Sequence, residues 1–316
     1  MPLDTESRKW LTRMLGKNVK FDEPMSRHTY IRVGGRADVY AAPDTGEKLI
    51  TLVRWSRQKG IPYLVIGDGT NLLVKDNGIK GVVLVLKKCF KSISQTYTEK
   101  DEVMVTAMAG AGMQTLCRFA IDKGLGGMNF ALGIPGTVGG GIIMNAGTSH
   151  GCMENVLDSI TVLQPTGQTQ RIDKEKLDFS YRSLSWLRAD NQVNAGQSVI
   201  LDGRFRLKPS DPDRLKKEAG AILKKRRKSQ PMDLPSAGCF FKNPAAGKSA
   251  GELIELAGLK GKSIGGAEIS TVHANFIINR GSASAADCLA LMELVQATVS
   301  EKFNVDLEPE VKIVGS

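Results

Sequence analysis

The chain has 316 residues, and its hydrophobic fraction of 41% with a charged fraction of 24% excludes a largely disordered protein. Its formal net charge of +10 favours anionic partners. No apolar run reaches the roughly 18 residues of a membrane span, and residues 1–20 lack the apolar centre of a signal peptide. We therefore expect a cytoplasmic protein, large enough for two or three domains.

Cysteine and histidine usage argues against a disulfide framework and against a metal site. The five cysteines are odd in number and form no CxxC pair. They are scattered along the chain: Cys89, Cys117, Cys152, Cys239 and Cys288. The three histidines also lie far apart in the sequence, so we predict no bound metal.

Residues 1–92 alternate between helical and strand-like patterns. The spacing of apolar residues predicts a helix from Glu47 to Lys59 and then a strand from Tyr63 to Ile66. This strand runs into Gly67-Asp68-Gly69-Thr70-Asn71. The turn lacks the third glycine of a dinucleotide-binding fingerprint, and strand-like sequence follows it where a long helix should begin. We interpret it as a turn whose backbone amides bind an anion.

Residues 93–207 contain the most glycine-rich stretch, Gly133 to Gly147, with six glycines in fifteen residues. Glycine permits positive φ and has no Cβ, so such a run can lay backbone N–H groups against a large flat or anionic ligand. On glycine content alone, a set of tight turns between apolar strands is the simpler interpretation. A helix from Gln114 to Lys123 is predicted before the stretch, and a hairpin of residues 159–163 and 168–172 after it.

Residues 208–316 begin with Asp211-Pro212, an N-cap followed by proline at the first helical position. The helix ends in the basic run 224–228. We interpret this run as a solvated helix end rather than a nucleic-acid patch, because no aromatic residues are interleaved with it. Capping patterns predict two more helices, one after Ser249 and a long one after Ser284.

Three polar residues stand in unusual local settings. Arg182 follows Tyr181, Cys239 lies in a loop of small residues, and Glu310 follows a proline ahead of an apolar strand. Taken singly, a surface cation, a buried thiol and a solvent-exposed carboxylate are the simpler interpretations. As alternatives, Arg182 could bind a carboxylate with both arms of its guanidinium, and Glu310 could be an acid that faces a cleft. Cys239 could be an acid or a nucleophile whose thiol pKa lies below roughly 8.5.

The order of the motifs along the chain is more specific than any one of them. Six segments follow one another from about residue 20 to the end: 33–37, 67–71, 133–147, 180–183, 235–244 and 307–311. In this order they closely resemble the UDP-N-acetylenolpyruvoylglucosamine reductase family, flavoenzymes of peptidoglycan precursor synthesis. No insertion that would supply a tyrosine-bearing lid is visible, so the chain resembles the shorter, second type of this family.

The resemblance implies an α+β fold. FAD would lie between two N-terminal subdomains of the FAD-binding PCMH or vanillyl-alcohol-oxidase type, which we place at 1–92 and 93–207. A C-terminal α+β domain, which we place at 208–316, would bind the substrate over the flavin. The FAD contacts that it implies come from the two glycine runs: Gly67, Asp68, Gly69, Thr70, Asn71, Gly133, Ile134, Pro135, Gly136, Thr137, Gly139, Ala146 and Gly147.

The same resemblance implies that NADPH reduces the flavin, and that hydride passes from flavin N5 to the enolpyruvyl ether of UDP-N-acetylglucosamine, giving UDP-N-acetylmuramate. Arg182 and a protonated Glu310, its pKa raised by burial, would stabilise the developing enediolate. Cys239 stands where most family members have the serine that protonates the substrate carbon. A thiol is the more acidic group, so its role as proton donor is a hypothesis. Four residues are implied as substrate contacts: Tyr181, Gln230, Lys242 and Asn243.

Two other functions stay open on the sequence. Another FAD oxidase or dehydrogenase of this fold would share the glycine runs, but would have no reason to carry both the Cys239 loop and Glu310. A nucleic-acid-binding protein would use the basic run instead. We expect a monomer that acts on a small molecule, with neither nucleic acid nor a membrane as partner.

Overall fold

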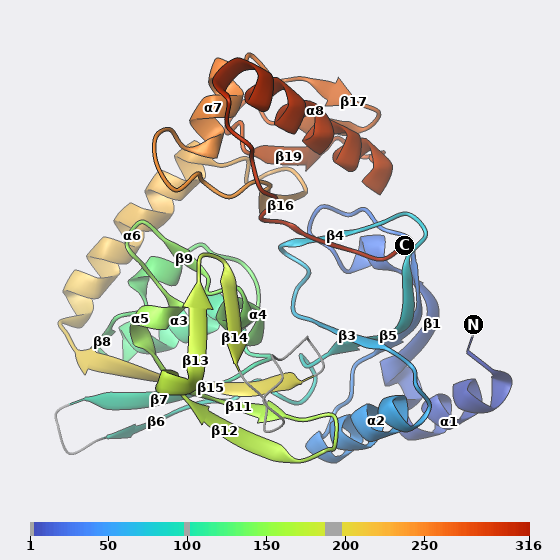
Figure 1. Ribbon diagram of the computed structural model, residues 1–316. Coiled ribbons are helices and arrows are strands. Elements are labelled where there is room, and N and C mark those ends of the chain that lie inside the picture. Colours follow the sequence, from blue (N-terminus) through green and yellow to red (C-terminus); the bar gives the residue numbers. More distant parts are fainter. Residues whose placement is uncertain (1–2, 98–101, 187–197) are drawn as a thin grey trace. The chain divides into compact units, whose positions relative to one another are not determined.

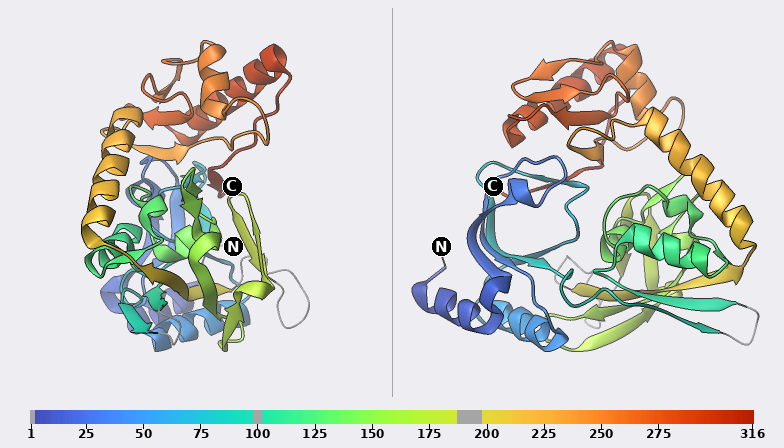
Figure 2. Two further views of the ribbon diagram at one scale, coloured as in Figure 1. Left: turned by 90° about the vertical axis from the view of Figure 1, so that its left-hand side faces the viewer. Right: turned by 180° about the vertical axis from the view of Figure 1, so that it is seen from behind.

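The computed structural model describes residues 3–97, 102–186 and 198–316, and these form two compact units (Figures 1 and 2). Each unit is assembled from separate stretches of the chain. Unit 1 comprises Met1–Lys20, Val39–Gly67 and Gly81–Lys224, and unit 2 comprises Phe21–Asp38, Asp68–Lys80 and Lys225–Ser316. The three domains predicted with boundaries at residues 92 and 207 stay a prediction.

Two helices near the N-terminus belong to unit 1. Helix α1 (Thr5–Leu15) is capped by the Asp4 carboxylate, and α2 (Gly46–Gln58) lies where the sequence predicts a helix. The rings of Trp10 and Trp55 stack with their centroids 4.9 Å apart. This aromatic contact packs α1 against α2.

The glycine turn follows β3, an edge strand of a sheet of order β1-β2-β5-β3. Its strands are β1 (Val19–Pro24), β2 (Arg36–Ala41), β3 (Tyr63–Ile66) and β5 (Ile79–Val85). Strands β3 and β5 are parallel, with Tyr63 opposite Val82. Strand β3 ends directly before Gly67, so the turn begins at the carboxyl end of a parallel strand, which is where open α/β sheets bind ligands.

The largest sheet of unit 1 is antiparallel and has the order β12-β11-β15-β7-β6. Its strands are β6 (Ile93–Tyr97), β7 (Val103–Met108), β11 (Leu157–Leu163), β12 (Thr169–Asp173) and β15 (Val199–Pro209), and β8 (Leu125–Gly126) pairs with β15. The predicted β11–β12 hairpin is confirmed. It turns at Gly167, whose φ of +82° is a conformation that favours glycine.

Three helices lie on one face of this sheet (Figure 1). They are α3 (Met113–Asp122), α4 (Val138–Ile143) and α5 (Met153–Val156), and α4 contacts both β7 and β15. Two small antiparallel pairs complete this region: β9 (Gly147–Thr148) with β10 (Gly151–Cys152), and β13 (Leu177–Ser180) with β14 (Ser183–Trp186). Short 3-10 turns are η1 (Gly16–Asn18), η2 (Met25–Arg27), η3 (Asn129–Ala131) and η4 (Lys174–Lys176).

Unit 2 is built on an antiparallel sheet of order β16-β19-β18-β17. Its strands are β16 (Ser236–Cys239), β17 (Ser263–Ile264), β18 (Ala267–Ile269) and β19 (Phe276–Asn279). The expected helices α7 (Ala250–Leu256) and α8 (Ala285–Phe303) each begin with a capping box. Residues of both helices and of the sheet share one apolar core, which includes the fully buried Phe240 and Phe241.

A parallel pair of strands, β4 (Leu72–Val74) and β20 (Lys312–Val314), joins the glycine turn to the C-terminal segment of unit 2. The loop after β4 is fixed to α8, because the Asp76 carboxylate accepts the first two N–H groups of that helix at 2.9 Å each. Helix α6 (Pro212–Ser229) runs across the sequence boundary between the units, and its buried residues are Leu215 and Ala219.

Across the described ranges, no helix is both long and apolar enough to cross a membrane. The same residues contain no cluster of three or more histidine, cysteine, aspartate or glutamate side chains that could hold a metal ion. All five cysteines are free thiols.

Candidate active site

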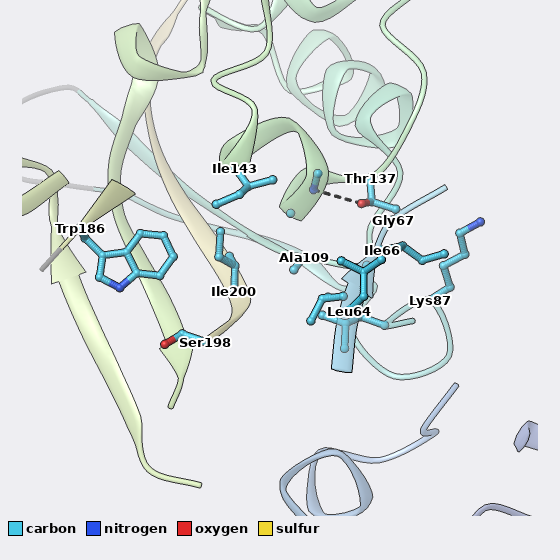
Figure 3. Close-up of a pocket in the computed structure, with 15 residues that line it drawn as sticks. Leu64, Ile66, Gly67, Lys87, Ala109, Thr137, Ile143, Trp186, Ser198 and Ile200 are labelled. Atoms are coloured by element: carbon cyan, nitrogen blue, oxygen red, sulfur yellow. Dashed lines mark hydrogen bonds between the residues drawn. The ribbon is translucent and has the colours of Figure 1, made fainter. Parts of the chain in front are cut away.

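Unit 1 contains a cavity of about 240 Å³ with a mainly apolar wall (Figure 3). The side chains of Leu64 and Ile66 lie on one side of it, and those of Ile143, Trp186 and Ile200 lie on the other. These residues come from β3, α4, β14 and β15, so the sheet that contains β3 and the large antiparallel sheet both line the cavity. A wall of this kind suits a planar aromatic ring system.

Two glycines of the cavity wall leave no room for a side chain. A Cβ on Gly67 would lie 2.4 Å from Oγ1 of Thr137, and a Cβ on Gly139 would lie 2.9 Å from Cβ of Ala109. Both distances are shorter than non-bonded carbon contacts allow. The end of β3, the start of α4 and the loop after β7 therefore approach one another closely only because glycine stands at these positions.

Many backbone N–H groups of the glycine-rich stretch already have acceptors inside unit 1. The N–H of Val138 donates to Ala111 O and that of Gly139 to Ala109 O, both at 2.9 Å. In contrast, the N–H groups of Gly136 and Thr137 have no acceptor among the residues that the structure describes. Two adjacent backbone donors of this kind suit a phosphate oxygen.

Arg182 stands at the tip of the β13–β14 hairpin with a φ of +61°. This left-handed conformation is uncommon for arginine and costs about 1 kcal/mol. The guanidinium carbon lies 4.7 Å from the centroid of the Tyr181 ring. The hairpin is tied to the glycine-rich stretch, since Asn145 Nδ2 donates to Ser180 O at 3.2 Å. Arg182 is thus held beside the predicted cofactor segment within unit 1.

The predicted cofactor residues that follow Asn145 are also fixed by backbone bonds. Asn145 is 5% exposed, and its Oδ1 accepts the N–H of Glu154 at 3.1 Å. The N–H of Ala146 donates to Gly141 O at 2.8 Å, and Gly147 pairs with Cys152 in the β9–β10 ladder. These N–H and C=O groups hold residues 145–147 in place.

Cys239 and Glu310 lie on adjacent segments of unit 2. The N–H of Glu310 donates at 2.8 Å to the carbonyl oxygen of Phe240, the residue directly after Cys239. Both Cys239 and Glu310 are half-buried. The structure therefore brings two of the three predicted catalytic residues together within one unit, while Arg182 belongs to the other unit.

The glycine turn of residues 68–71 is held in unit 2 against the segment that carries Glu310. Asn71 Nδ2 donates to the carbonyl oxygen of Glu310 at 3.1 Å. On the other side of the turn, a Cβ on Gly69 would lie 2.1 Å from the carbonyl oxygen of His28. The turn can therefore be this tight only with glycine at position 69.

The predicted substrate contacts are distributed over both units. Tyr181 is 49% exposed in unit 1. In unit 2, Lys242 Nζ forms an ion pair with Glu308 at 3.0 Å, and Asn243 Oδ1 accepts the N–H of the first residue of α7 at 3.1 Å. Gln230 directly follows α6. Lys242 and Asn243 thus have partners within their own unit.

Arg226 is a residue of the site region that the sequence does not single out. It belongs to the basic end of α6, yet its Nε is buried and has no hydrogen-bond partner within the described part of the chain. Burial lowers the pKa of its guanidinium, and the charge interaction with Cys239 raises it. A buried N–H of a cation is costly when no acceptor compensates it, so the half-buried Arg226 is suited to bind an anionic ligand.

Two family models match the chain. The model of an FAD binding domain matches residues 37–173, and that of the UDP-N-acetylenolpyruvoylglucosamine reductase C-terminal domain matches residues 230–314. The chain is 47% identical to the UDP-N-acetylenolpyruvoylglucosamine reductase of Desulfosudis oleivorans, over 99% of this chain and 100% of that one. The enzyme of the same name from Geobacillus kaustophilus is 40% identical, over 95% of this chain and 94% of that one.

A solved structure shows the same relationship. The crystal structure of UDP-N-acetylenolpyruvylglucosamine reductase from Thermus caldophilus matches with a TM-score of 0.74 and 34% identity, and the match covers 92% of this chain and 97% of that one. These matches confirm the expected α+β class with a flavin-binding domain and a C-terminal domain, and the chain length fits the shorter type. The chain therefore belongs to the UDP-N-acetylenolpyruvoylglucosamine reductase family, and it is an FAD-dependent oxidoreductase.

Proposed function

We propose that the protein uses NADPH to reduce the enolpyruvyl ether of UDP-N-acetylglucosamine to UDP-N-acetylmuramate. Family membership and the FAD-binding domain support the reaction and the cofactor. The observation that carries the proposal is the backbone pairing that joins the Cys239 segment to Glu310 in unit 2. An alcohol or lactone oxidase would need a flavin site but would have no need for a thiol and a carboxyl group on these two bonded segments.

The residues around the cavity fit FAD. The apolar wall suits a planar ring, the close approach at Gly67 needs glycine, and the N–H groups of Gly136 and Thr137 are available to a phosphate oxygen. When bound, FAD supplies a group that accepts hydride from reduced nicotinamide and delivers it to a carbon acceptor. We assign residues 67–71 and 133–147 to its binding.

Arg182 and Glu310 would stabilise negative charge on the substrate. Hydride addition to the enolpyruvyl double bond moves negative charge onto its carboxylate. A guanidinium can donate two parallel hydrogen bonds to a carboxylate, and a protonated carboxyl group can donate one more. The left-handed backbone of Arg182 supports this role, since strained conformations persist where a side chain has to be aimed.

Cys239 would donate the proton to the carbon that bears the ether oxygen. With a reference pKa of roughly 8.5, a thiol is largely protonated at neutral pH, and it ionises far more easily than a serine hydroxyl. Arg226 would stabilise the thiolate that is left, because the two groups interact electrostatically. Its buried Nε would in addition bind an anionic group of the nucleotide.

An anaerobic assay on protein of measured flavin content tests the proposal. NADPH consumption is followed with and without the enolpyruvyl nucleotide, and the product is identified by mass spectrometry. We expect consumption only when the nucleotide is present, with one NADPH used for each product formed. Colourless protein that takes up no FAD, or NADPH consumption that requires oxygen, would overturn the proposal.

A further inference from the structure

Gln114, in the first turn of α3, binds three backbone groups of a single turn. Its Nε2 donates to Ile134 O at 2.7 Å and to Ala131 O at 3.1 Å, and its Oε1 accepts the N–H of Gly133 at 3.1 Å. A glutamine amide offers two N–H donors and one oxygen acceptor, and here each kind of group is used. The side chain therefore fixes the path of residues 131–134.

The turn also has backbone bonds of its own. Gly133 has a φ of +76°, and within the turn the N–H of Ile134 donates to Ala131 O at 3.0 Å. The N–H of Leu132 donates to Asn129 O at 3.2 Å, so these two backbone bonds are local to the turn. The three bonds of Gln114, in contrast, join the turn to helix α3.

The turn leads directly into the two available N–H donors of the cavity region. Met113, the residue before Gln114, donates its N–H to Gly136 O at 2.9 Å, and Gly112 lies opposite Thr137 in an isolated bridge. Residues 111–114 therefore bond to the segment 131–138 at several points. Thr137 lines the cavity, whereas Gln114 does not.

We propose that Gln114 is a positioning residue for the cofactor. Its amide holds the turn at Gly133 so that the N–H groups of Gly136 and Thr137 are directed at a phosphate oxygen of FAD. The inference rests on FAD binding at this cavity, and it adds a residue that no glycine motif contains. Because Gln114 acts through the turn, its loss weakens cofactor binding without removing a contact to the cofactor.

Two substitutions and a matched control test this role. Gln114→Glu keeps the length and one acceptor, but it removes both donors and sets a carboxylate against two carbonyl oxygens. Gln114→Leu removes all three bonds. The control Gln164→Glu makes the same change on the β11–β12 hairpin, where the amide of Gln164 bonds Gln170.

The readouts are the FAD dissociation constant, from titration of apoprotein, and the visible circular dichroism of bound flavin. We expect both Gln114 variants to raise the dissociation constant at least about tenfold, and Gln164→Glu to change it less than about twofold. At saturating FAD, kcat should recover more fully than the affinity, and the flavin dichroism should differ from that of the wild type.

Three results would overturn the positioning role of Gln114. Wild-type affinity in both Gln114 variants would overturn the inference and leave the reductase function standing. The inference would also be overturned if the variants lost FAD affinity and their apoproteins lost the far-ultraviolet circular dichroism of folded protein. Gln114 would then have only a structural role. Failure of the wild-type protein itself to bind FAD would overturn both the inference and the proposed function.

Discussion

Asn275 allows a quantitative test of how the Cys239 segment is held. Its buried side chain forms two hydrogen bonds to the backbone of one residue, Phe241. Oδ1 accepts the N–H of Phe241 at 2.9 Å, and Nδ2 donates to Phe241 O at 2.8 Å. Phe241 lies opposite Pro309 in a bridge whose bonds are made by the flanking residues, so its own N–H and C=O point away from that segment. The Asn275 amide takes the place of a neighbouring strand.

Asn275→Ala would remove both bonds and leave two backbone groups unsatisfied. Phe241 is 1% exposed and Asn275 is 3% exposed, so water reaches neither group in the native packing. An unsatisfied buried group costs about 1–3 kcal/mol. We therefore expect the free energy of unfolding of unit 2 to fall by about 3 kcal/mol, and kcat to fall because Cys239 lies in the loosened segment.

Urea denaturation followed by circular dichroism measures this loss. Asn77→Ala is a suitable control, since Asn77 is exposed in the same unit, and its effect should stay within about 0.5 kcal/mol. A loss below about 1 kcal/mol for Asn275→Ala, or an equal loss in both variants, would show that the Asn275 side chain does not hold Phe241.

Three further predictions concern buried groups. Burial raises the pKa of the Cys117 and Cys288 thiols to about 12, so both should resist iodoacetamide in the native protein; mass spectrometry that finds either one alkylated as fast as in unfolded protein would contradict this. Burial lowers the pKa of His273 below its usual 6.5, and its Nδ1 accepts the N–H of Asn275 at 3.2 Å. The folded pKa lies below the unfolded value, so the stability that neutral His273 contributes is present above about pH 6.5 and is lost as pH falls through the folded pKa. Denaturation curves at decreasing pH should show that the free energy of unfolding falls more in the wild type than in His273→Gln. An identical dependence on pH in the two proteins would contradict this prediction. Finally, Arg226→Met should raise KM for the nucleotide about tenfold or more without lowering stability, and an unchanged KM would exclude an anion contact.

Elements with a strong local signal could be predicted from the sequence alone. The capping boxes at Ser249 and Ser284 and the apolar strands at 63–66 and 72–74 appear at the predicted positions, because caps and apolar runs are determined by neighbouring residues. The glycine-rich stretch could not be predicted in this way. Its central part is α4, whose first N–H groups bond to residues 109 and 111, and these partners are distant in sequence.

The candidate site shows the same limit. The order of motifs pointed to Cys239 and Glu310, and the structure explains their association through a backbone bond between distant segments. The role of Arg226 could not be predicted, because it is one of five consecutive basic residues in the sequence. Only the packing of the folded chain shows that its Nε is buried. Gln114 occupies an ordinary helical position, and its importance comes from the turn that packs against it.

The proton-donor role of Cys239 is tested by the oxidative half-reaction of three proteins. Wild type, Cys239→Ser and Cys239→Ala are reduced with NADPH in the absence of oxygen and mixed with the enolpyruvyl nucleotide, and the return of oxidised flavin absorbance is timed. We predict that Cys239→Ala reoxidises about 100-fold more slowly or worse, that Cys239→Ser retains turnover, and that NADPH reduces all three equally fast. Equal reoxidation rates in the wild type and Cys239→Ala would contradict it.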